Sequence, residues 1–463
     1  MMTKAQIQYF IENFNEITSV DKDILKKYGQ DETEDLLFMP EVVLHPSTTK
    51  EVSALLKYCN EQLIPVTPSG ARTGLSGGAL PIKGGVVLSF ERMNKIIAID
   101  ENNFQVTVEP GVITEVLQEA VKEKGLFYPP DPASKGSCFI GGNIAENSGG
   151  PKAVKYGVTA SYVLNLEVVL PNGEVIWTGA DSIKNATGYN ITQLIVGSEG
   201  TLGVVTKIVL RLIPHPTHDL LLFVPFKSAE KACEAVVSIM SSGITPSGLE
   251  FMERDAVAWT LDKFPEIQFE IEQNAQAFLL IEVDGFNENV LFQDIEKIHE
   301  ILSHFETGEI LFADSQATKD KLWEIRRKIS EAVKKNSIYK EEDTVVRRFE
   351  IPKLLKGVKE IGDKYGFKSV CYGHVGDGNL HVNIIKGDLT DEQWNNELPN
   401  AIREIFKLSV ALGGTISGEH GIGLVQKQYM DIPFTDTSLQ IMREIKKIFD
   451  PNNILNPGKI VDV

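Results

Sequence analysis

The sequence predicts an α+β protein of more than one domain, and three observations support this class. The chain has 463 residues, which is too long for a single hydrophobic core. Short apolar runs typical of strands alternate with segments that have the period of helices. Glycine-dense loops crowd residues 126–215, and regular elements return afterwards. We expect three parts: a helical segment at 1–38, a domain of two α/β subdomains at 39–217, and an α+β domain at 218–463.

The first half of the chain begins with polar residues of helical pattern and continues as a β-α-β unit. Thr48 and Glu51 have the spacing of a capping box, and the apolar residues after them recur at helical intervals. Gly125 has the position of a helix stop. The expected elements are strands at Val42–Leu44, Ile64–Thr67, Val86–Phe90, Ile96–Asp100 and Gln105–Glu109, and helices from Thr48 and from about Ile113, the second with Val116, Leu117, Ala120 and Val121 on one face.

The second half resumes regular structure after the segment PHPTH at residues 214–218, which we interpret as a domain boundary. Strand-like and helical patterns follow one another to the end of the chain. The expected elements are a strand at 220–226, a helix from Ser228, a strand at 277–285, a charged amphipathic helix at 315–335, a β-hairpin at 371–385, and a helix at 438–449 with Ile441, Ile445 and Ile448 on one face.

Charge and cysteine content exclude several classes of protein. The formal net charge is −18, a balance that repels nucleic acid and anionic lipid. The four cysteines lie far apart and never form a CxxC pair, which argues against disulfides, iron–sulfur clusters and thiolate zinc sites. Any metal must therefore be held by histidine and carboxylate ligands. Without a bilayer-spanning apolar stretch or a secretory signal pattern, a cytoplasmic location is expected.

The first glycine-rich loop, PSGARTGLSGGAL at residues 68–80, has the composition of an anion-binding loop. Its closely spaced glycines let successive backbone N–H groups turn toward one anion, and its hydroxyl side chains add donors. A pyrophosphate fits this pattern. The loop matches neither GxGxxG nor GxxxxGK[ST], so the Rossmann and P-loop interpretations fail. The alternative is a mobile glycine-rich turn without a ligand.

Two further clusters make a nucleotide site the better interpretation. They are DPASKGSCFIGGNIAENSGGPKAVKYG at residues 131–157 and NATGYNITQLIVGSEGTLGVVT at residues 185–206. In this order, the three motifs resemble the flavoproteins of the vanillyl-alcohol oxidase-like, PCMH-type superfamily. Within it, the chain is similar to the branch of D-lactate dehydrogenase, the glycolate oxidase flavin subunit and D-2-hydroxyglutarate dehydrogenase. The resemblance extends from about Pro40 to the end of the chain.

The resemblance implies a PCMH-type FAD-binding domain followed by an FAD-linked oxidase cap domain. FAD is expected to be bound without a covalent bond, since the first loop lacks the histidine that covalent members often use. The residues implied for the pyrophosphate are Ser69, Gly70, Ala71, Arg72, Thr73, Gly74, Ser76, Gly77 and Gly78. Those implied for the isoalloxazine and ribityl region are Pro130, Asp131, Ser134, Gly141, Gly142, Asn143, Asn147, Gly149 and Tyr156. Those implied toward the adenosine are Glu199, Gly200 and Val204, with Asn456 closing over the flavin.

Arg72 departs from the family, which usually has a small residue or Asn at this position. Its charge either contacts the pyrophosphate or points to solvent, and the sequence leaves both open.

The histidines of the hairpin form a candidate metal site. If residues 376–379 make the turn, His374 lies opposite His381, and Asn383 shares their face of the sheet. Two imidazoles so placed can share one divalent ion, with Glu419 as a third ligand and His420 as a base. The alternative is a pair of hydrogen-bonded sheet histidines. The resemblance favours the metal, because the D-2-hydroxyglutarate branch binds zinc with the matching residues. The ligands do not choose between Zn, Mn and Fe.

A substrate carboxylate calls for the planar donor fork of arginine. Arg326 matches the family's carboxylate-binding residue, and Ser330 and Asn383 are the other substrate contacts expected. The alternative for a helix arginine is a solvated charge. Arg347, Arg348 and Lys340 are further cations near this region, and Arg347 replaces a proline usual in the family.

The resemblance implies oxidation of a D-2-hydroxy acid, D-lactate or glycolate, to the 2-oxo acid by hydride transfer to flavin N5. D-2-hydroxyglutarate is the alternative substrate, and ether flavoenzyme chemistry or a non-catalytic flavin subunit are the other classes. An external electron acceptor is expected: a quinone, an electron-transfer flavoprotein, an iron–sulfur subunit or a cytochrome, with the chain peripheral to the inner membrane through it. The substrate, the metal, the reactivity with oxygen and a homodimer stay open.

Overall fold

The computed structural model describes residues 2–33 and 36–463. Met1, Glu34 and Asp35, which belong to the segment expected to be helical, lie outside the described residues. The chain forms two compact units. The first unit contains Met1–Gly149, Val158–His215 and Glu419–Val463, and the second contains Gly150–Gly157 and Pro216–Gly418. The chain thus passes between the units near the expected boundary at residues 217 and 218, and its last part is grouped with the first unit.

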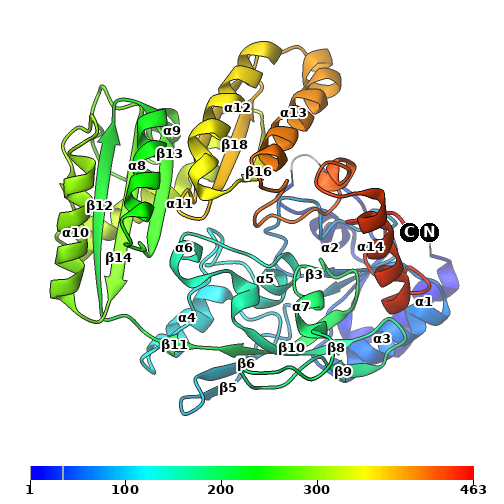
Figure 1. Cartoon of the computed structure of the whole chain (residues 1–463). Helices are drawn as coiled ribbons and strands as arrows, with labels where there is room; N and C mark the ends of the chain where they lie inside the picture. The colour runs from blue at the N-terminus through cyan, green and yellow to red at the C-terminus, as the bar shows by residue number, and fades with distance from the viewer. Residues whose placement is uncertain (1, 34–35) are drawn as a thin grey trace. The chain divides into compact units, whose positions relative to one another are not determined.

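The first unit is built on two sheets, one largely parallel and one antiparallel (Figure 1). In the four-stranded sheet, β2, β4 and β3 are parallel, and β1 pairs with β2 in the antiparallel sense. Its strands are, in spatial order, β1 (Thr18–Ser19), β2 (Val42–Leu44), β4 (Val86–Ser89) and β3 (Val66–Ser69). The antiparallel sheet has the order β5 (Ile96–Asp100), β6 (Gln105–Val108), β10 (Val204–Arg211), β8 (Val163–Val169) and β9 (Val175–Trp177). A further pair joins β11 (Ile213–Pro214) to β7 (Leu126–Phe127).

Most α-helices of the first unit begin at a residue whose side chain caps the helix, whereas α4 and α5 begin without such a cap. Thr48 and Glu51 make the expected capping box at the start of α3. The α-helices are α1 (Lys4–Asn13), α2 (Lys22–Tyr28), α3 (Thr49–Glu61), α4 (Thr114–Lys122), α5 (Ile140–Glu146), α7 (Ile191–Ile195) and α14 (Asp436–Phe449). Short 3₁₀ turns lie at η1 (Asn15–Ile17), η2 (Thr159–Ser161) and η5 (Gln426–Tyr429). Leu455 of the C-terminal tail bridges Val66, so the tail extends the first sheet beside β3.

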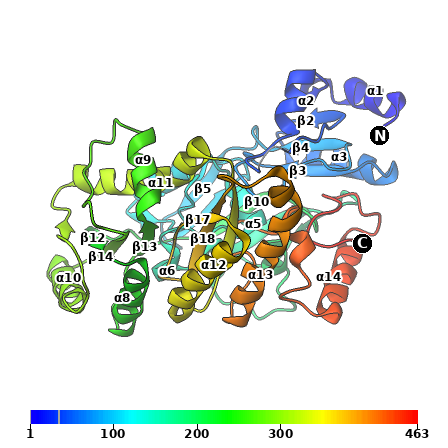
Figure 2. The same cartoon turned by 90° about the horizontal axis from the view of Figure 1, so that it is seen from above.

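The second unit is one seven-stranded antiparallel sheet with helices on both faces. Its strands are, in spatial order, β15 (Leu311–Phe312), β12 (His218–Phe226), β14 (Ala277–Gly285), β13 (Gly248–Glu253), β17 (Lys368–Gly373), β18 (Asn379–Ile385) and β16 (Tyr339–Val345). Helices α8 (Ala229–Ser241), α10 (Glu288–Leu302), α12 (Ile351–Tyr365) and α13 (Leu398–Ala411) form a row on one face, and α9 (Arg254–Lys263) and α11 (Gln316–Asn336) pack on the other (Figure 2). The short elements are α6 (Ala153–Tyr156), η3 (Arg348–Glu350) and the π-turn η4 (Gln393–Glu397).

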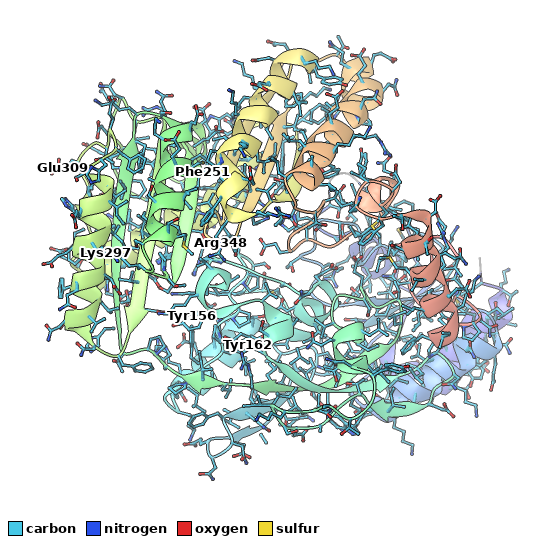
Figure 3. The ribbon with its side chains drawn as sticks, in the orientation of Figure 1. Tyr156, Tyr162, Phe251, Lys297, Glu309 and Arg348 are labelled. Carbon is cyan, nitrogen blue, oxygen red and sulfur yellow. The ribbon has the colours of Figure 1, made fainter. Side chains whose placement is uncertain are left out.

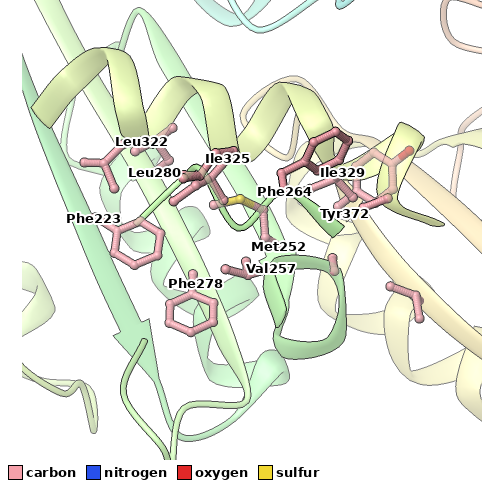
Figure 4. Packing of buried hydrophobic residues seen from close by; sticks show 14 of the residues in the cluster. Phe223, Met252, Val257, Phe264, Phe278, Leu280, Leu322, Ile325, Ile329 and Tyr372 are labelled. Carbon is pink, nitrogen blue, oxygen red and sulfur yellow. The ribbon is translucent and has the colours of Figure 1, made fainter. Parts of the chain in front are cut away.

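One hydrophobic core of the second unit lies between the sheet and α11. Ile325 and Ile329 of α11 pack against Tyr372 and neighbouring strand residues (Figure 4). This packing fixes the helix over the strands that carry the hairpin histidines. The sheet, the helices and the glycine-rich connections confirm the predicted α+β class.

Two predicted helix faces are wrong in part. Val116 of α4 is 53% exposed, and the side chains that α4 buries are Thr114, Leu117 and Val121. On α14, Ile441 and Ile448 are exposed, whereas Leu439 and the aliphatic stem of Lys446 are buried. The Lys446 ammonium is buried because it donates to the carboxylate of Asp450 and to two backbone carbonyls. Among the described residues, every helix is too short or too polar to cross a membrane.

Candidate active site

One face of the sheet in the second unit carries a row of polar side chains. Across β16 and β18, Asp343 pairs with His381 and Glu341 pairs with Asn383. Across β17 and β18, Tyr372 pairs with His381. Because paired residues share a face and alternate residues along a strand do too, these five side chains lie on the same side of the sheet.

The predicted register of the hairpin is wrong by two residues. His381 pairs with Tyr372, and not with His374. The N–H groups of Asp377 and Asn379 both donate to the carbonyl of His374 at 3.2 Å, so the turn spans residues 375–378. Gly378 makes this turn with a φ of +96°, a conformation that favours glycine. A two-residue shift preserves the face, and the two imidazole ring centroids lie 5.5 Å apart.

Glu250 of β13 is a buried carboxylate that the sequence analysis missed. Both of its carboxylate oxygens lie 2.8 Å from His374 Nδ1, and Oε2 accepts the Nε–H of Arg326 at 2.7 Å. Burial raises the pKa of Glu250, but the charges of His374 and Arg326 outweigh burial and hold the pKa below its usual value. The available signal was an acidic residue inside the otherwise apolar strand GLEFM.

Arg326 and Ser330 both lie at the ring of Tyr372. The Arg326 side chain is 5% exposed, and its guanidinium carbon lies 5.0 Å from the Tyr372 ring centroid. Ser330, one helical turn further on, hydrogen-bonds the Tyr372 hydroxyl. Burial, followed by the charge of Glu341, raises the pKa of Tyr372. Arg326 is thus a buried cation and not a solvated helix charge.

Asn383 and Glu341 keep polar atoms without hydrogen bonds. Asn383 is fully buried, and neither its side-chain nitrogen nor its oxygen has a partner among the described residues. Glu341 Oε1 lies 3.3 Å from His381 Nδ1 and accepts the Tyr372 hydroxyl at 3.5 Å. Its Oε2 has no partner within the described parts of the chain. Buried polar atoms in this state are typical of a site that awaits a ligand.

The end of the second unit leads directly to Glu419. The N–H of Gly418 donates to Asp343 Oδ2 at 2.7 Å, and the Ser417 hydroxyl donates to the same oxygen at 3.0 Å. Glu419 is the next residue of the chain and belongs to the first unit, where its carboxylate lies against Gly149. The role of Glu419 as a third metal ligand and the role of His420 as a base stay predictions.

The other cations expected near the site point elsewhere. Lys340 neighbours Glu341 on β16, so its side chain is on the opposite face, where it lies 5.3 Å from the Trp394 ring centroid. Arg347 and Arg348 are exposed (Figure 3 labels Arg348). Arg347 has a φ of −56°, a value that proline also adopts, so its replacement of proline leaves the local backbone shape intact.

In the first unit, the first glycine-rich loop contacts the N-terminal segment. Arg72 has a φ of +62°, and its guanidinium carbon lies 4.1 Å from the Tyr28 ring centroid and its Nη1 lies 3.7 Å from Glu91 Oε1. Arg72 is therefore held over Tyr28 and does not project into solvent. The N–H of Gly77 donates to the Thr33 hydroxyl at 2.7 Å, so the N-terminal segment occupies this donor of the loop.

Three glycines of the first unit leave room beside their backbone. Gly70 faces Gly142, with 3.7 Å between an ideal Cβ on Gly70 and the Cα of Gly142. An ideal Cβ on Gly74 or on Gly142 would meet no atom within 4 Å. The Ser76 hydroxyl lies near Gly78 and Gly423 instead, where it is buried and has no hydrogen-bond partner among the described residues. Open backbone and an unsatisfied hydroxyl are the kinds of group that bind a pyrophosphate.

Glu199 and Asn456 join distant segments of the first unit near Gly78. Glu199 accepts the N–H groups of Ile422 and Gly423, each at 2.7 Å. Asn456 donates to the carbonyls of Gly78 and Glu199 at 2.8 and 2.9 Å. Burial raises the pKa of Glu199 to about 7, although the two N–H groups oppose it. The side-chain amide of Asn456 therefore links the C-terminal tail to the first glycine-rich loop and to Glu199.

The remaining residues expected at the flavin fall in both units. Asn143 donates to the Thr114 hydroxyl at 2.6 Å, and Asn147, in the left-handed conformation, accepts the Ala160 N–H at 2.8 Å. Tyr156, labelled in Figure 3, belongs to the second unit and donates its hydroxyl to Asp284 at 2.8 Å. Also in the first unit are Ser69, Ala71, Thr73, Pro130, Asp131, Ser134, Gly141, Gly200 and Val204.

The chain is similar in sequence to known proteins over nearly its whole length. The glycolate oxidase subunit GlcD of Bacillus subtilis is 40% identical over 436 residues, covering 94% of this chain and 91% of that protein. A D-lactate dehydrogenase of Anaerostipes hadrus is 38% identical over 460 residues, covering 97% and 96%. A D-2-hydroxyglutarate dehydrogenase of Stutzerimonas stutzeri is 33% identical over 443 residues, covering 95% of each.

The fold has a solved counterpart. p-Cresol methylhydroxylase superposes with a TM-score of 0.78 at 18% identity, covering 100% of this chain and 98% of that one. This confirms the predicted PCMH-type fold. The model of the FAD binding domain matches residues 40–179, and that of the C-terminal domain of FAD linked oxidases matches residues 215–460. The chain therefore belongs to the FAD-linked oxidases and is an oxidoreductase of that family.

Proposed function

We propose that this chain oxidises a small D-2-hydroxy acid, D-lactate or glycolate, to the 2-oxo acid and passes the electrons to an external acceptor. The observation that carries the proposal is the buried contact of Arg326, Glu250 and His374. Arg326 supplies a positive charge for a carboxylate. Nη2 of its guanidinium lies 3.5 Å from Nδ1 of His374, which is a proposed metal ligand. The names of the relatives support the same class of substrate.

FAD, when bound, supplies the hydride acceptor for this reaction. The space around Gly70, Gly74 and Gly142 fits its pyrophosphate, and we propose that it is held without a covalent bond. A divalent ion would be held by His374, His381 and Glu419 and would lower the pKa of the substrate hydroxyl. Zn, Mn and Fe remain equally compatible with nitrogen and oxygen ligands.

The chain's own residues bind and deprotonate the substrate. The guanidinium of Arg326 pairs with the substrate carboxylate, and Ser330 and Asn383 complete the pocket with hydrogen bonds. His420 accepts the proton of the 2-hydroxyl while the hydrogen on C2 leaves as a hydride. Asn383 suits its role because its buried amide has no partner among the described residues.

D-2-hydroxyglutarate is the second candidate substrate, since one relative carries that name. Its second carboxylate would need another cation. On the polar face of the sheet the residue paired with Asn383 is the acidic Glu341, while Lys340 lies on the opposite face. Because two carboxylates repel at short range, we rank the diacid below D-lactate and glycolate.

The acceptor is proposed to be a quinone, an electron-transfer flavoprotein, an iron–sulfur subunit or a cytochrome. The GlcD relative is named as a subunit of glycolate oxidase, which supports an assembly with a further subunit. The cytoplasmic location, the homodimer and the division at residues 39–217 and 218–463 stay predictions from the sequence.

Steady-state turnover with a dye acceptor tests the proposal. We expect D-lactate or glycolate to reduce the dye, with L-lactate inactive and D-2-hydroxyglutarate slower. Replacing Arg326 by Lys keeps the charge but loses the planar fork, so we expect the KM for the acid to rise at least tenfold. A holoprotein that oxidises none of these acids, while it reduces dye with another donor, contradicts the proposal.

A further inference from the structure

The geometry points to Glu250 as a positioning residue of the metal site. We infer that Glu250 fixes the proton of His374 on Nδ1 and thereby presents Nε2 to a divalent cation. The inference rests on the proposed metal site, and it assigns a task to a residue that touches neither the substrate nor the metal.

The hydrogen-bond chemistry of the three groups determines the position of this proton. A carboxylate only accepts, and both oxygens of Glu250 lie 2.8 Å from His374 Nδ1. Nδ1 must therefore carry the hydrogen. Arg326 Nη2 also lies 3.5 Å from Nδ1, but a guanidinium only donates, so this contact is not the hydrogen bond that orients the ring. A metal binds histidine in its neutral form, and in that form a proton on Nδ1 leaves the lone pair on Nε2, the nitrogen that can act as a ligand.

Burial makes the arrangement rigid. The side chain of Glu250 is fully buried, and those of His374 and Arg326 are 7% and 5% exposed. A buried carboxylate hydrogen-bonded to the second nitrogen of a ligand histidine fixes the ring and raises its basicity toward the metal.

The same carboxylate determines how Arg326 meets a substrate. Because Glu250 Oε2 accepts the Nε–H of Arg326 at 2.7 Å, that edge of the guanidinium is occupied. A substrate carboxylate must then approach the two Nη groups at the end of the fork. Glu250 thus orients a metal ligand and a substrate-binding cation at once.

The contacts of His381 Nδ1 with carboxylates are longer than that of His374. Nδ1 of His381 lies 3.3 Å from Glu341 and 3.8 Å from Asp343, both longer than the contact of His374 with Glu250. Loss of Glu250 is therefore expected to affect one of the two histidine ligands selectively.

Metal binding to chelator-stripped protein, with Zn²⁺ or Mn²⁺ as the probe and a chromophoric chelator as competitor, tests the inference. We expect Glu250→Gln to weaken cation binding by 10- to 100-fold, the range usual for such partners. The matched control is Glu282→Gln, which removes another buried glutamate from the neighbouring strand β14, where Lys152, Ser247 and Trp323 hold it. This control should keep cation affinity within twofold. Equal weakening in both variants, or none in Glu250→Gln, overturns the inference.

A double variant guards against misfolding, because Glu250→Gln alone leaves the buried charge of Arg326 without its counter-charge. Glu250→Gln combined with Arg326→Met removes both charges. We expect this double variant to fold and to bind the cation as weakly as the single Glu250 variant. A folded double variant that binds the cation with wild-type affinity overturns the inference.

Imidazole ¹⁵N spectra of the cation-free protein separate this inference from the proposed function. We expect His374, assigned with a His374→Gln variant, to carry its proton on Nδ1 and to lose that preference in Glu250→Gln. A proton on Nε2 in the wild type overturns the role of Glu250. A wild type with the expected spectrum that binds no divalent cation overturns the metal site instead.

Discussion

The glycine-lined space of the first unit and the polar strand face of the second unit are built in different ways. The first is made of backbone, and residues such as Gly74 and Gly142 contribute by leaving room. The second is made of charged side chains, and Glu250, His374 and Arg326 contribute by holding one another. Substitutions in the first should therefore change ligand binding with little effect on folding, whereas substitutions in the second should change both.

The largest effect is expected from Arg326→Ala in the second unit. It leaves the charge of Glu250 buried and removes the neighbour that always carries a positive charge, which typically costs about 3–5 kcal/mol of the free energy of unfolding. Urea unfolding followed by circular dichroism measures this cost. A loss below about 1 kcal/mol would mean that the arginine is not the counter-charge of Glu250.

Gly142→Ala in α5 is the matching change in the first unit. A Cβ there meets no protein atom within 4 Å, and alanine favours a helix by about 1 kcal/mol over glycine. We expect the apoprotein to be as stable as the wild type or more stable, while FAD binds at least tenfold more weakly. Flavin fluorescence titration measures the affinity, and unchanged FAD affinity would show that the cofactor does not use this space.

The pH dependence of stability should report on the buried Glu199 of the first unit. Burial raises the pKa of Glu199 from 4.5 to about 7 in the folded first unit, so the protonated form is the one the fold favours. Its contribution to stability is complete below about pH 4.5 and is lost as the pH rises through about 7. Glu199→Gln should flatten the fall of the denaturation midpoint over this window, and an unchanged slope would contradict the assignment.

The smallest effect is expected at α14, where the sequence suggested a buried apolar face. Ile448 is 76% exposed, so Ile448→Gln should change the free energy of unfolding by no more than about 0.5 kcal/mol. Leu439→Ala, at a buried position of the same helix, should cost about 2–4 kcal/mol. Comparable losses for the two would show that Ile448 is covered in solution.

The same contrast explains how much the sequence could predict. The nucleotide region was predictable because glycine spacing, turns and motif order are local features of the chain, as are the capping box at Thr48 and the strand at β2. The polar strand face of the second unit was predicted only in outline. The hairpin itself is local, but its register depends on the turn around Gly378. The prediction placed His381 opposite His374, whereas the structure pairs His381 with Tyr372.

Glu250 shows what the sequence could not supply. It lies 124 residues before His374 in the chain and reaches it only because β13 pairs with β17 in the sheet. The predicted buried face of α14 was wrong for a related reason. The helical period identifies an apolar stripe, but only tertiary contacts decide which side of the helix is covered. Charged partners of a site are set by such long-range pairing, which periodicity does not report.

Anaerobic mixing of the FAD-loaded protein with D-lactate, glycolate and L-lactate, followed by flavin absorbance, tests the central claim most directly. The account predicts that D-lactate or glycolate bleaches the oxidised flavin band within seconds in the wild type, that L-lactate does not, and that Arg326→Lys slows the bleaching severely. A yellow protein whose flavin no 2-hydroxy acid reduces, or one that Arg326→Lys leaves equally fast, would contradict it.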